Sequence, residues 1–372
     1  MKTPRPCPSS RKKRPTRKPR TTRADLDKAE SYLADYKRTD QTTPDLSVVY
    51  GLKARAYLTM EKWPEAEEYA KKAQEGYTMM TEAEYLDHDK GFNTPNNSWM
   101  FMTKYDAEDP NITLNDGDSS WGSQMMIEIT TSNGYAHGAG TVKRIDAHLL
   151  EIIPQTDWRR KCFIDPELDE LVAEAQTVEE LNKIVADYLS DVSSYPETIT
   201  STAQASASGA FGGLSLKFRL GGGDAGHSNA QFVGFVVAVP LMRVEEMKLI
   251  EAEAAGMQDE GRGKTLLEAF AKTRDPQYTY NDLQSFRDNV GWQRRVELWG
   301  EGFATFDIKR FEKGITRSYA GTNHPKGYRW NTDGVPDWMN LCIVGTEVNF
   351  NQACTNNPTP IQPTEDSPEK VW

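Results

Sequence analysis

The chain has 372 residues, 37% hydrophobic and 27% charged, which fits a globular protein with room for one large domain or two smaller ones. It has no run of the roughly 20 apolar residues that cross a bilayer. The net charge of -11 is unevenly distributed, because ten Lys and Arg residues and no acid precede Ala24. The acidic remainder argues against nucleic-acid binding, which needs a basic surface, and suits neutral or cationic ligands.

Residues 1–23 form a basic segment rich in Pro, Arg, Lys and Ser. We predict that it is disordered, because it holds too little apolar surface to bury. A nucleic-acid-binding arm or a targeting signal is the alternative interpretation. The segment does not match a signal peptide, since no apolar core follows its positive charges. Cys7 also lacks the preceding apolar stretch of a lipoprotein cleavage site.

Residues 24–76 read as helices. Residues 24–36 are charged and amphipathic, and Asp45 is suited to cap a helix over residues 46–60. Pro64 then stands at the start of a second helix, which Gly76 should end. The apolar face of this second helix consists of Ala66, Tyr69, Ala70 and Ala73. Small residues let antiparallel helices approach closely, so the pattern predicts one tetratricopeptide-type hairpin.

The remaining chain alternates between loop-rich and helical stretches. Residues 77–145 lose helical periodicity and are rich in Asn, Asp, Gly and aromatic residues, and so long a loop is usually functional. Residues 193–228 are rich in Gly, Ser and Ala, with a strand expected over 214–220, and the tail from Gly314 is irregular. Helices are predicted over 146–192, with a capping box at Thr177, and over 240–255 and 291–311.

Three stretches together resemble the SusD/RagB family of glycan-binding lipoproteins. They are the hairpin at 52–58 with 63–70, the helix at 239–254 and the later helix at 293–311. Their order agrees with the family, and residues 347–358 are similar to its C-terminus, so the resemblance spans roughly 25–358. It implies a mainly α, SusD-like helical fold with tetratricopeptide-type hairpins and long loop-rich insertions, as one domain over residues 24–372.

The resemblance also implies a function and a location. A member of this family binds an oligosaccharide or polysaccharide without cleaving it and delivers it to a SusC-like, TonB-dependent transporter in the outer membrane. Family members normally begin with a signal peptide, a lipid-bearing cysteine and several further helices. None of these precedes Ala24, so we expect a chain truncated at its N-terminus, whose place at the cell surface is inferred from the family alone.

Aromatic residues in loops are the best candidates for the glycan site. A sugar ring has apolar C–H faces on which an exposed aromatic ring can stack, and a rim of hydroxyls that Asn, Asp and Arg can bind. The candidates for this site are Trp121, Tyr135, Trp330, Tyr105, Asn133 and Tyr328, with Trp338 nearby. Trp99 lies in an apolar run and is assigned to the core, and the core should also hold Trp63, Trp158, Trp292 and Trp299.

Two other functions are alternatives to glycan binding. A helical glycoside hydrolase would need two carboxylates flanking a sugar. Glu297 and Glu301 are spaced four residues apart on one helix face, beside Arg294 and Arg295, so we interpret them as members of Arg–Glu pairs. A tetratricopeptide-type scaffold that binds a protein and no sugar is the second alternative. A groove lined by aliphatic and basic residues would favour it.

Cofactor chemistry has little support in the sequence. The five histidines show no metal-ligand spacing, and the Gly-rich stretch at 221–226 lacks the Lys and Ser or Thr of a phosphate-binding loop. Asp116 and Asp118 are weak calcium candidates, since oxygen ligands cluster around them without an EF-hand spacing. Cys342 and Cys354 can either pair in an oxidising compartment or remain free thiols.

Overall fold

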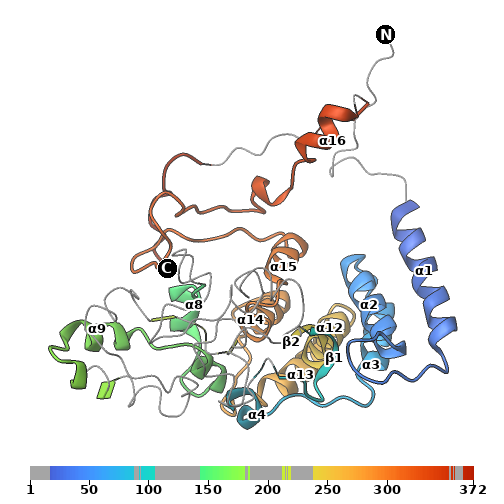
Figure 1. Ribbon diagram of the computed structural model, residues 1–372, viewed down its shortest axis with the longest axis horizontal. Helices are drawn as coiled ribbons and strands as arrows, with labels where there is room; N and C mark the ends of the chain where they lie inside the picture. Colours follow the sequence, from blue (N-terminus) through green and yellow to red (C-terminus); the bar gives the residue numbers. More distant parts are fainter. Residues whose placement is uncertain are drawn as a thin grey trace. The chain divides into compact units, whose positions relative to one another are not determined.

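The computed structural model describes residues 17–87, 92, 94–104, 143–180, 183–184, 212–213, 215, 217–218, 238–351, 353–354, 356 and 363–372. The chain divides into two compact units. One is formed by Met1–Ser31 together with Gly302–Trp372, and the other by Tyr32–Glu301. The fold is mainly helical, as expected from the sequence (Figure 1).

The predicted hairpin is confirmed in the larger unit. It consists of α2 (Leu46–Thr59) and α3 (Trp63–Ala73). The Asp45 side chain accepts hydrogen bonds from the first turn of α2, and Pro64 lies at the start of α3. Gly76 takes a left-handed φ of 85° in the turn that follows α3. Four alanines of the hairpin are fully buried, so the two helix backbones pack closely: Ala54, Ala66, Ala70 and Ala73.

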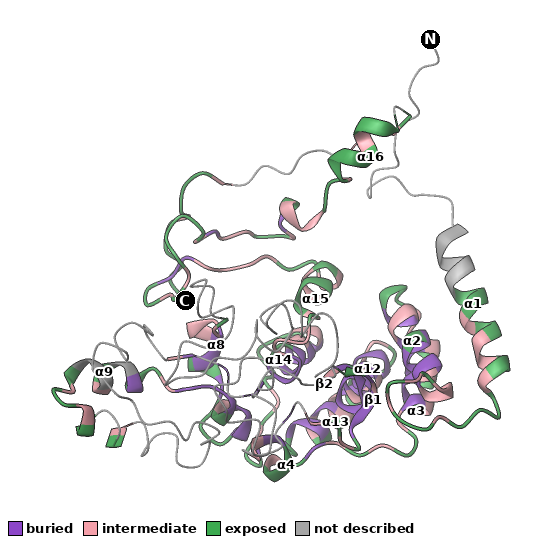
Figure 2. Cartoon of the chain, viewed as in Figure 1, coloured by how far each residue is buried: buried purple, intermediate pink, exposed green. Residues whose placement is uncertain are grey.

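A second hairpin packs beside the first, although it lies about 170 residues later in the chain. It pairs α12 (Val244–Gly256) with α13 (Glu260–Ala271), and α12 also packs on α3 (Figure 1). A Cβ atom added at Gly263 would lie 2.2 Å from the Gly256 Cα, so only glycine allows this crossing. Most of α12 is buried (Figure 2). Helix α13 is not predicted from the sequence.

A two-stranded antiparallel sheet precedes α12. In it β1 (Trp99–Lys104) pairs with β2 (Ala238–Arg243). Trp99 is fully buried, so its assignment to the core is confirmed. The helix predicted from residue 240 is wrong for its first residues, because backbone pairing with β1 holds them extended.

The segment predicted as helix over 146–192 is broken into short pieces. Within its described part it contains α8 (Ala147–Ile152), a 3-10 turn η1 (Trp158–Cys162) and α9 (Glu167–Glu174). Pro154 and Pro166 lie between these elements and cannot supply the backbone donors of a continuous helix. The capping box of Thr177 with Glu180 is present, with hydrogen bonds of 3.1 and 3.2 Å.

The single helix expected over 291–311 is also wrong. The structure has α14 (Phe286–Glu297) and α15 (Ala304–Arg310). The break contains Gly300 and Gly302, with left-handed φ angles of 77° and 84° that an α-helix does not accommodate. Ser285 caps α14, so the helix begins at Phe286, five residues before the predicted start at Gly291.

The unit formed by the chain ends has few regular elements among its described residues. Helix α1 (Arg17–Leu33) lies mostly within it and begins inside the segment predicted to be disordered. The others are α15, η2 (Asp337–Met339) and α16 (Gly345–Phe350). No helix among the described residues of either unit is long and apolar enough to span a bilayer.

The larger unit is centred on a buried ionic cluster. It contains four bases and four acids whose side chains are each at most 3% exposed: Arg159, Lys217, Arg243, Arg274, Asp157, Glu245, Glu297 and Glu301. The members come from the start of η1, the end of β2, the start of α12, the segment after α13, the end of α14 with the residues that follow it, and the segment at residue 217. Charges that are separated in sequence therefore compensate one another inside the protein.

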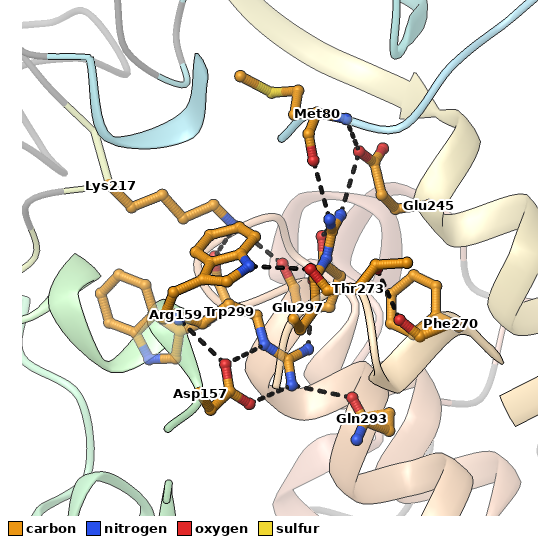
Figure 3. A network of polar contacts seen from close by, with 12 residues as sticks. Met80, Asp157, Arg159, Lys217, Glu245, Phe270, Thr273, Gln293, Glu297 and Trp299 are labelled. Atoms are coloured by element: carbon orange, nitrogen blue, oxygen red, sulfur yellow. Dashed lines mark hydrogen bonds and ion pairs between the residues drawn. The ribbon is translucent and has the colours of Figure 1, made fainter. Parts of the chain in front are cut away.

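Glu297 lies at the centre of the ionic cluster (Figure 3). Its Oε1 accepts from Arg243 Nη1 at 2.9 Å, and its Oε2 accepts from Arg274 Nε at 3.1 Å and Arg159 Nη1 at 3.2 Å. Arg159 also binds both oxygens of Asp157 and Gln293 Oε1. Burial alone raises the pKa of Glu297, but the three arginines outweigh it and hold that pKa well below 4.5.

Glu301 is held in the same way. Arg243 donates to its two carboxylate oxygens at 2.8 and 2.9 Å, and Lys217 Nζ donates to its Oε1 at 2.6 Å. Burial alone raises the pKa of Glu301, but Arg243 and Lys217 together lower it. Lys217 Nζ also donates to the backbone carbonyls of Glu297 and Trp299. Both glutamates are thus ionised, and both carboxylate oxygens of each accept hydrogen bonds from buried bases.

We predict that Glu297→Gln lowers the free energy of unfolding by about 3–5 kcal/mol, because three buried arginines lose their common counter-charge. Urea denaturation would measure the loss. The matched control is Glu68→Gln, which removes an exposed pair with Lys72 at 2.6 Å. Exposed pairs contribute less than about 1 kcal/mol, so the control should change little. Equal losses in the two variants would contradict a central role for Glu297.

The ionic cluster also predicts a pH dependence of stability. Folding lowers the pKa of Glu297 and Glu301 below 4.5, so their contribution is complete above that pH and is lost as pH falls toward the folded-state values. Denaturation curves between pH 7 and pH 3 should show the wild type losing stability in acid more steeply than Glu297→Gln. Parallel pH profiles for the two proteins would refute this expectation.

Candidate functional site

The candidate site lies in the unit formed by the chain ends, on what we call the aromatic loop, residues 324–332. The loop begins with a tight turn in which the Tyr328 backbone N–H donates to the Pro325 carbonyl at 3.2 Å. Gly327 has a left-handed φ of 85° in this turn, which favours glycine. The turn places the Tyr328 side chain at the surface, where 57% of the residue is exposed.

Two tryptophans pack behind the Tyr328 ring. The Tyr328 and Trp330 ring centroids are 5.5 Å apart, and Trp330 makes an edge contact with Trp338 at 5.2 Å. Trp338 lies in η2 and is half-buried. Trp330 is only 5% exposed, so the expectation that its ring is an open platform is wrong. Packing beneath Tyr328 and against Trp338 covers it. Tyr328 is therefore the exposed member of a three-ring cluster.

Side-chain to backbone hydrogen bonds hold the loop, which lacks regular secondary structure. The Asn331 Oδ1 accepts from the backbone N–H groups of Arg317 and Ser318, each at 2.9 Å. Its Nδ2 donates to the Ser318 carbonyl at 3.0 Å. Arg329 Nε donates to the His324 carbonyl at 2.8 Å. These bonds fix the backbone under the rings, so that an exposed ring projects from a rigid base.

This arrangement can bind a ligand that has one apolar face. An exposed tyrosine offers a flat apolar surface and a hydroxyl, and the rings behind it restrict its movement. Little ordering is needed when a ring is already held in place, which favours binding.

The other predicted site residues lie outside the described residues. These are Tyr105, Trp121, Asn133 and Tyr135, together with the calcium candidates Asp116 and Asp118. Among the residues that the structure describes, no group of three His, Cys, Asp or Glu is arranged to hold a metal ion. Cys342 and Cys354 are not joined by a disulfide; Cys342 is exposed and Cys354 is half-buried.

The glutamates that a hydrolase would use do not form a cleft. Glu297 is fully buried and the Glu301 side chain is 3% exposed, and both are occupied by buried cations. Their interpretation as members of Arg–Glu pairs is confirmed, with arginines that come from other elements. The expectation that both lie on one helix face is wrong, because α14 ends at Glu297. Their lowered pKa values also make them poor general acids, since a proton donor needs a raised pKa.

The sequence does not predict the polar residues that support the aromatic loop. Asn331 forms a hydrogen bond with Ser318, 13 residues away in the sequence, and Asp366 forms one with Gly327, 39 residues away. No local pattern marks such bonds. The only signal is an Asn or Asp in an irregular stretch, which ordinary turns explain equally well.

Comparison with known proteins places the chain in a family. The model of the SusD family matches residues 26–364. No protein with a curated description matches. Among solved structures, a SusD-like carbohydrate binding protein from Bacteroides vulgatus is 20% identical with a TM-score of 0.61, over 90% of this chain and 64% of that one. A SusD superfamily protein from Bacteroides thetaiotaomicron is 14% identical with a TM-score of 0.60, over 92% and 66%.

A third similar structure is the surface glycan-binding protein A from Bacteroides thetaiotaomicron. It is 16% identical with a TM-score of 0.56, over 90% of this chain and 70% of that one. The chain spans less than two thirds of the length of the first two structures. At these identities the likeness establishes the fold, and the family match covers most of the chain. The chain belongs to the SusD family.

Proposed function

We propose that this protein binds an oligosaccharide or polysaccharide at the cell surface without cleaving it, and delivers it to a SusC-like, TonB-dependent transporter of the outer membrane. The observation that carries the proposal is the Tyr328 ring, more than half exposed and backed by Trp330 and Trp338. A sugar stacks its apolar C–H face on such a ring and turns its hydroxyls toward neighbouring polar groups.

Family membership and fold support the same function. Two of the similar structures are named for carbohydrate or glycan binding. The acidic body of the chain suits a neutral glycan better than an anionic one. Stacking and hydrogen bonds without a covalent step give an affinity that still allows release to a transporter.

The loop candidates outside the described residues extend this proposal. Trp121, Tyr135 and Tyr105 would add stacking surfaces, and Asn133 would bind hydroxyls. Calcium at Asp116 and Asp118 would order their loop, but binding through stacked rings does not require a cofactor. Each of these assignments stays a prediction.

We predict that Tyr328→Ala weakens glycan binding by about 5- to 150-fold, the equivalent of about 1–3 kcal/mol for one stacked ring by analogy with aromatic stacking on nucleobases. The melting temperature should hardly change, because an exposed ring contributes little packing. An affinity-gel screen against polysaccharides would identify the ligand, and calorimetry would measure the affinity of each variant.

The matched control is Tyr32→Ala, which removes a tyrosine that is 81% exposed on α1, outside the aromatic loop. It should bind as the wild type does. Normal binding by Tyr328→Ala would place the glycan site elsewhere. A protein that retains no polysaccharide but captures a protein partner would favour the tetratricopeptide-type scaffold.

A further prediction separates binding from hydrolysis. Incubation of the purified protein with the polysaccharide that it binds should release no new reducing ends, because Glu297 and Glu301 are buried in ion pairs. A reducing-sugar assay over a day, with a glycosidase as positive control, would detect slow turnover. Release that depends on Glu297 would support the hydrolase alternative.

A further inference from the structure

A short segment near the end of the chain holds the aromatic loop from one side. We call residues 366–370 the C-terminal strap. The Ser367 N–H donates to the Arg329 carbonyl at 2.9 Å, and the Asn331 N–H donates to Ser367 Oγ at 2.9 Å. Asn331 Nδ2 also donates to the Pro368 carbonyl at 3.1 Å. The strap thus pairs with the loop along the stretch that carries the aromatic rings.

The strap is itself anchored on its other side. Ser318 Oγ donates to the Ser367 carbonyl at 2.7 Å, and the Lys370 N–H donates to the Ser318 carbonyl at 2.9 Å. Tyr319 and Lys370 form an isolated parallel bridge. Because Ser318 also binds Asn331, three segments of the chain share one hydrogen-bond network.

Asp366 makes the contact closest to the proposed platform. Its Oδ1 accepts from the backbone N–H groups of Gly327 and Arg329, each at 2.9 Å, and its Oδ2 accepts from Gly327 at 3.1 Å. These two residues flank Tyr328 in the chain. One carboxylate therefore restrains the backbone on both sides of the exposed ring.

The Asp366 carboxylate is well suited to this task. The two backbone N–H groups hold the pKa of Asp366 below its usual 3.8, so the side chain is an ionised acceptor at neutral pH. A backbone held from both sides leaves the Tyr328 ring few orientations to lose when a ligand arrives. Restraint of this kind before binding improves affinity without any contact to the ligand.

We propose that Asp366 is a positioning residue of the candidate glycan site, which acts by holding the Tyr328 platform in its binding orientation. The inference rests on the proposed function, since it assigns Asp366 a role in binding through Tyr328. It also makes a separate claim about the free protein, namely that Asp366 restrains the loop before any glycan binds.

The first test concerns the free protein. Hydrogen-exchange mass spectrometry of the peptide that carries residues 325–331 should show slow exchange in the wild type and fast exchange in Asp366→Ala. Asp366→Asn keeps an oxygen in the Oδ1 position and should retain most of the protection. The matched control, Glu365→Ala, removes the same charge from the neighbouring exposed residue and should exchange as the wild type does. Unchanged exchange in Asp366→Ala would overturn the proposal.

The second test measures affinity for the polysaccharide retained in the affinity-gel screen. Asp366→Ala should bind roughly two- to tenfold more weakly, the cost of ordering a ring that is no longer held. Asp366→Asn should recover most of this loss, and Glu365→Ala should show none. In the double variant Asp366→Ala/Tyr328→Ala, binding should be no weaker than in Tyr328→Ala alone, because Asp366 acts through the ring.

Failure of this inference and failure of the proposed function give different results. Additive losses in the double variant, or an equal loss in Glu365→Ala, would overturn the positioning role while glycan binding stands. Full affinity in Tyr328→Ala would place the glycan site elsewhere, and no retention of any polysaccharide would remove the proposed function. Either result would remove any role of Asp366 in binding. The exchange measurement would then still decide whether Asp366 holds the loop.

Discussion

Compensation of buried charge is the constraint on which the larger unit depends. Four cations and four anions lie out of water, and an uncompensated buried charge costs several kcal/mol. Glu297 needs Arg159, Arg243 and Arg274 together, which brings η1, β2 and the segment after α13 to the end of α14. An apolar contact tolerates a shifted neighbour, whereas these ion pairs require one geometry. The ionic cluster therefore favours a single arrangement of the helices around it.

The aromatic loop follows a different physical rule. It has no helix or strand to satisfy its backbone, so side chains such as Asn331 and Asp366 supply the hydrogen bonds. This leaves the surface free to expose Tyr328 while Trp330 is covered beneath it. Rigid support under an exposed ring is what a binding protein needs, because the cost of ordering is met when the chain folds.

The helices show which features of the fold can be predicted from sequence patterns and which cannot. The α2–α3 hairpin was predicted because its cap, its proline and its alanines all lie within the hairpin itself. Helix α13 was missed because Gly261 and Gly263 lower its helix propensity. Gly263 allows close contact between α13 and Gly256, and helix propensities do not take such a packing contact into account. Likewise, Glu301 follows the break after α14 and binds Lys217 and Arg243, which lie more than 50 residues away in the sequence.

By itself, the sequence determined the family, the mainly helical fold, the first hairpin with its caps and the assignment of Trp99 to the core. It also indicated that Glu297 and Glu301 pair with arginines. Only the tertiary structure decided which arginines those are, that Trp330 is covered while Tyr328 is open, and that Asp366 reaches Gly327. Caps and helical faces depend on residues a few positions apart, which the sequence places side by side. Burial and ion pairing depend on segments that meet only when the chain folds.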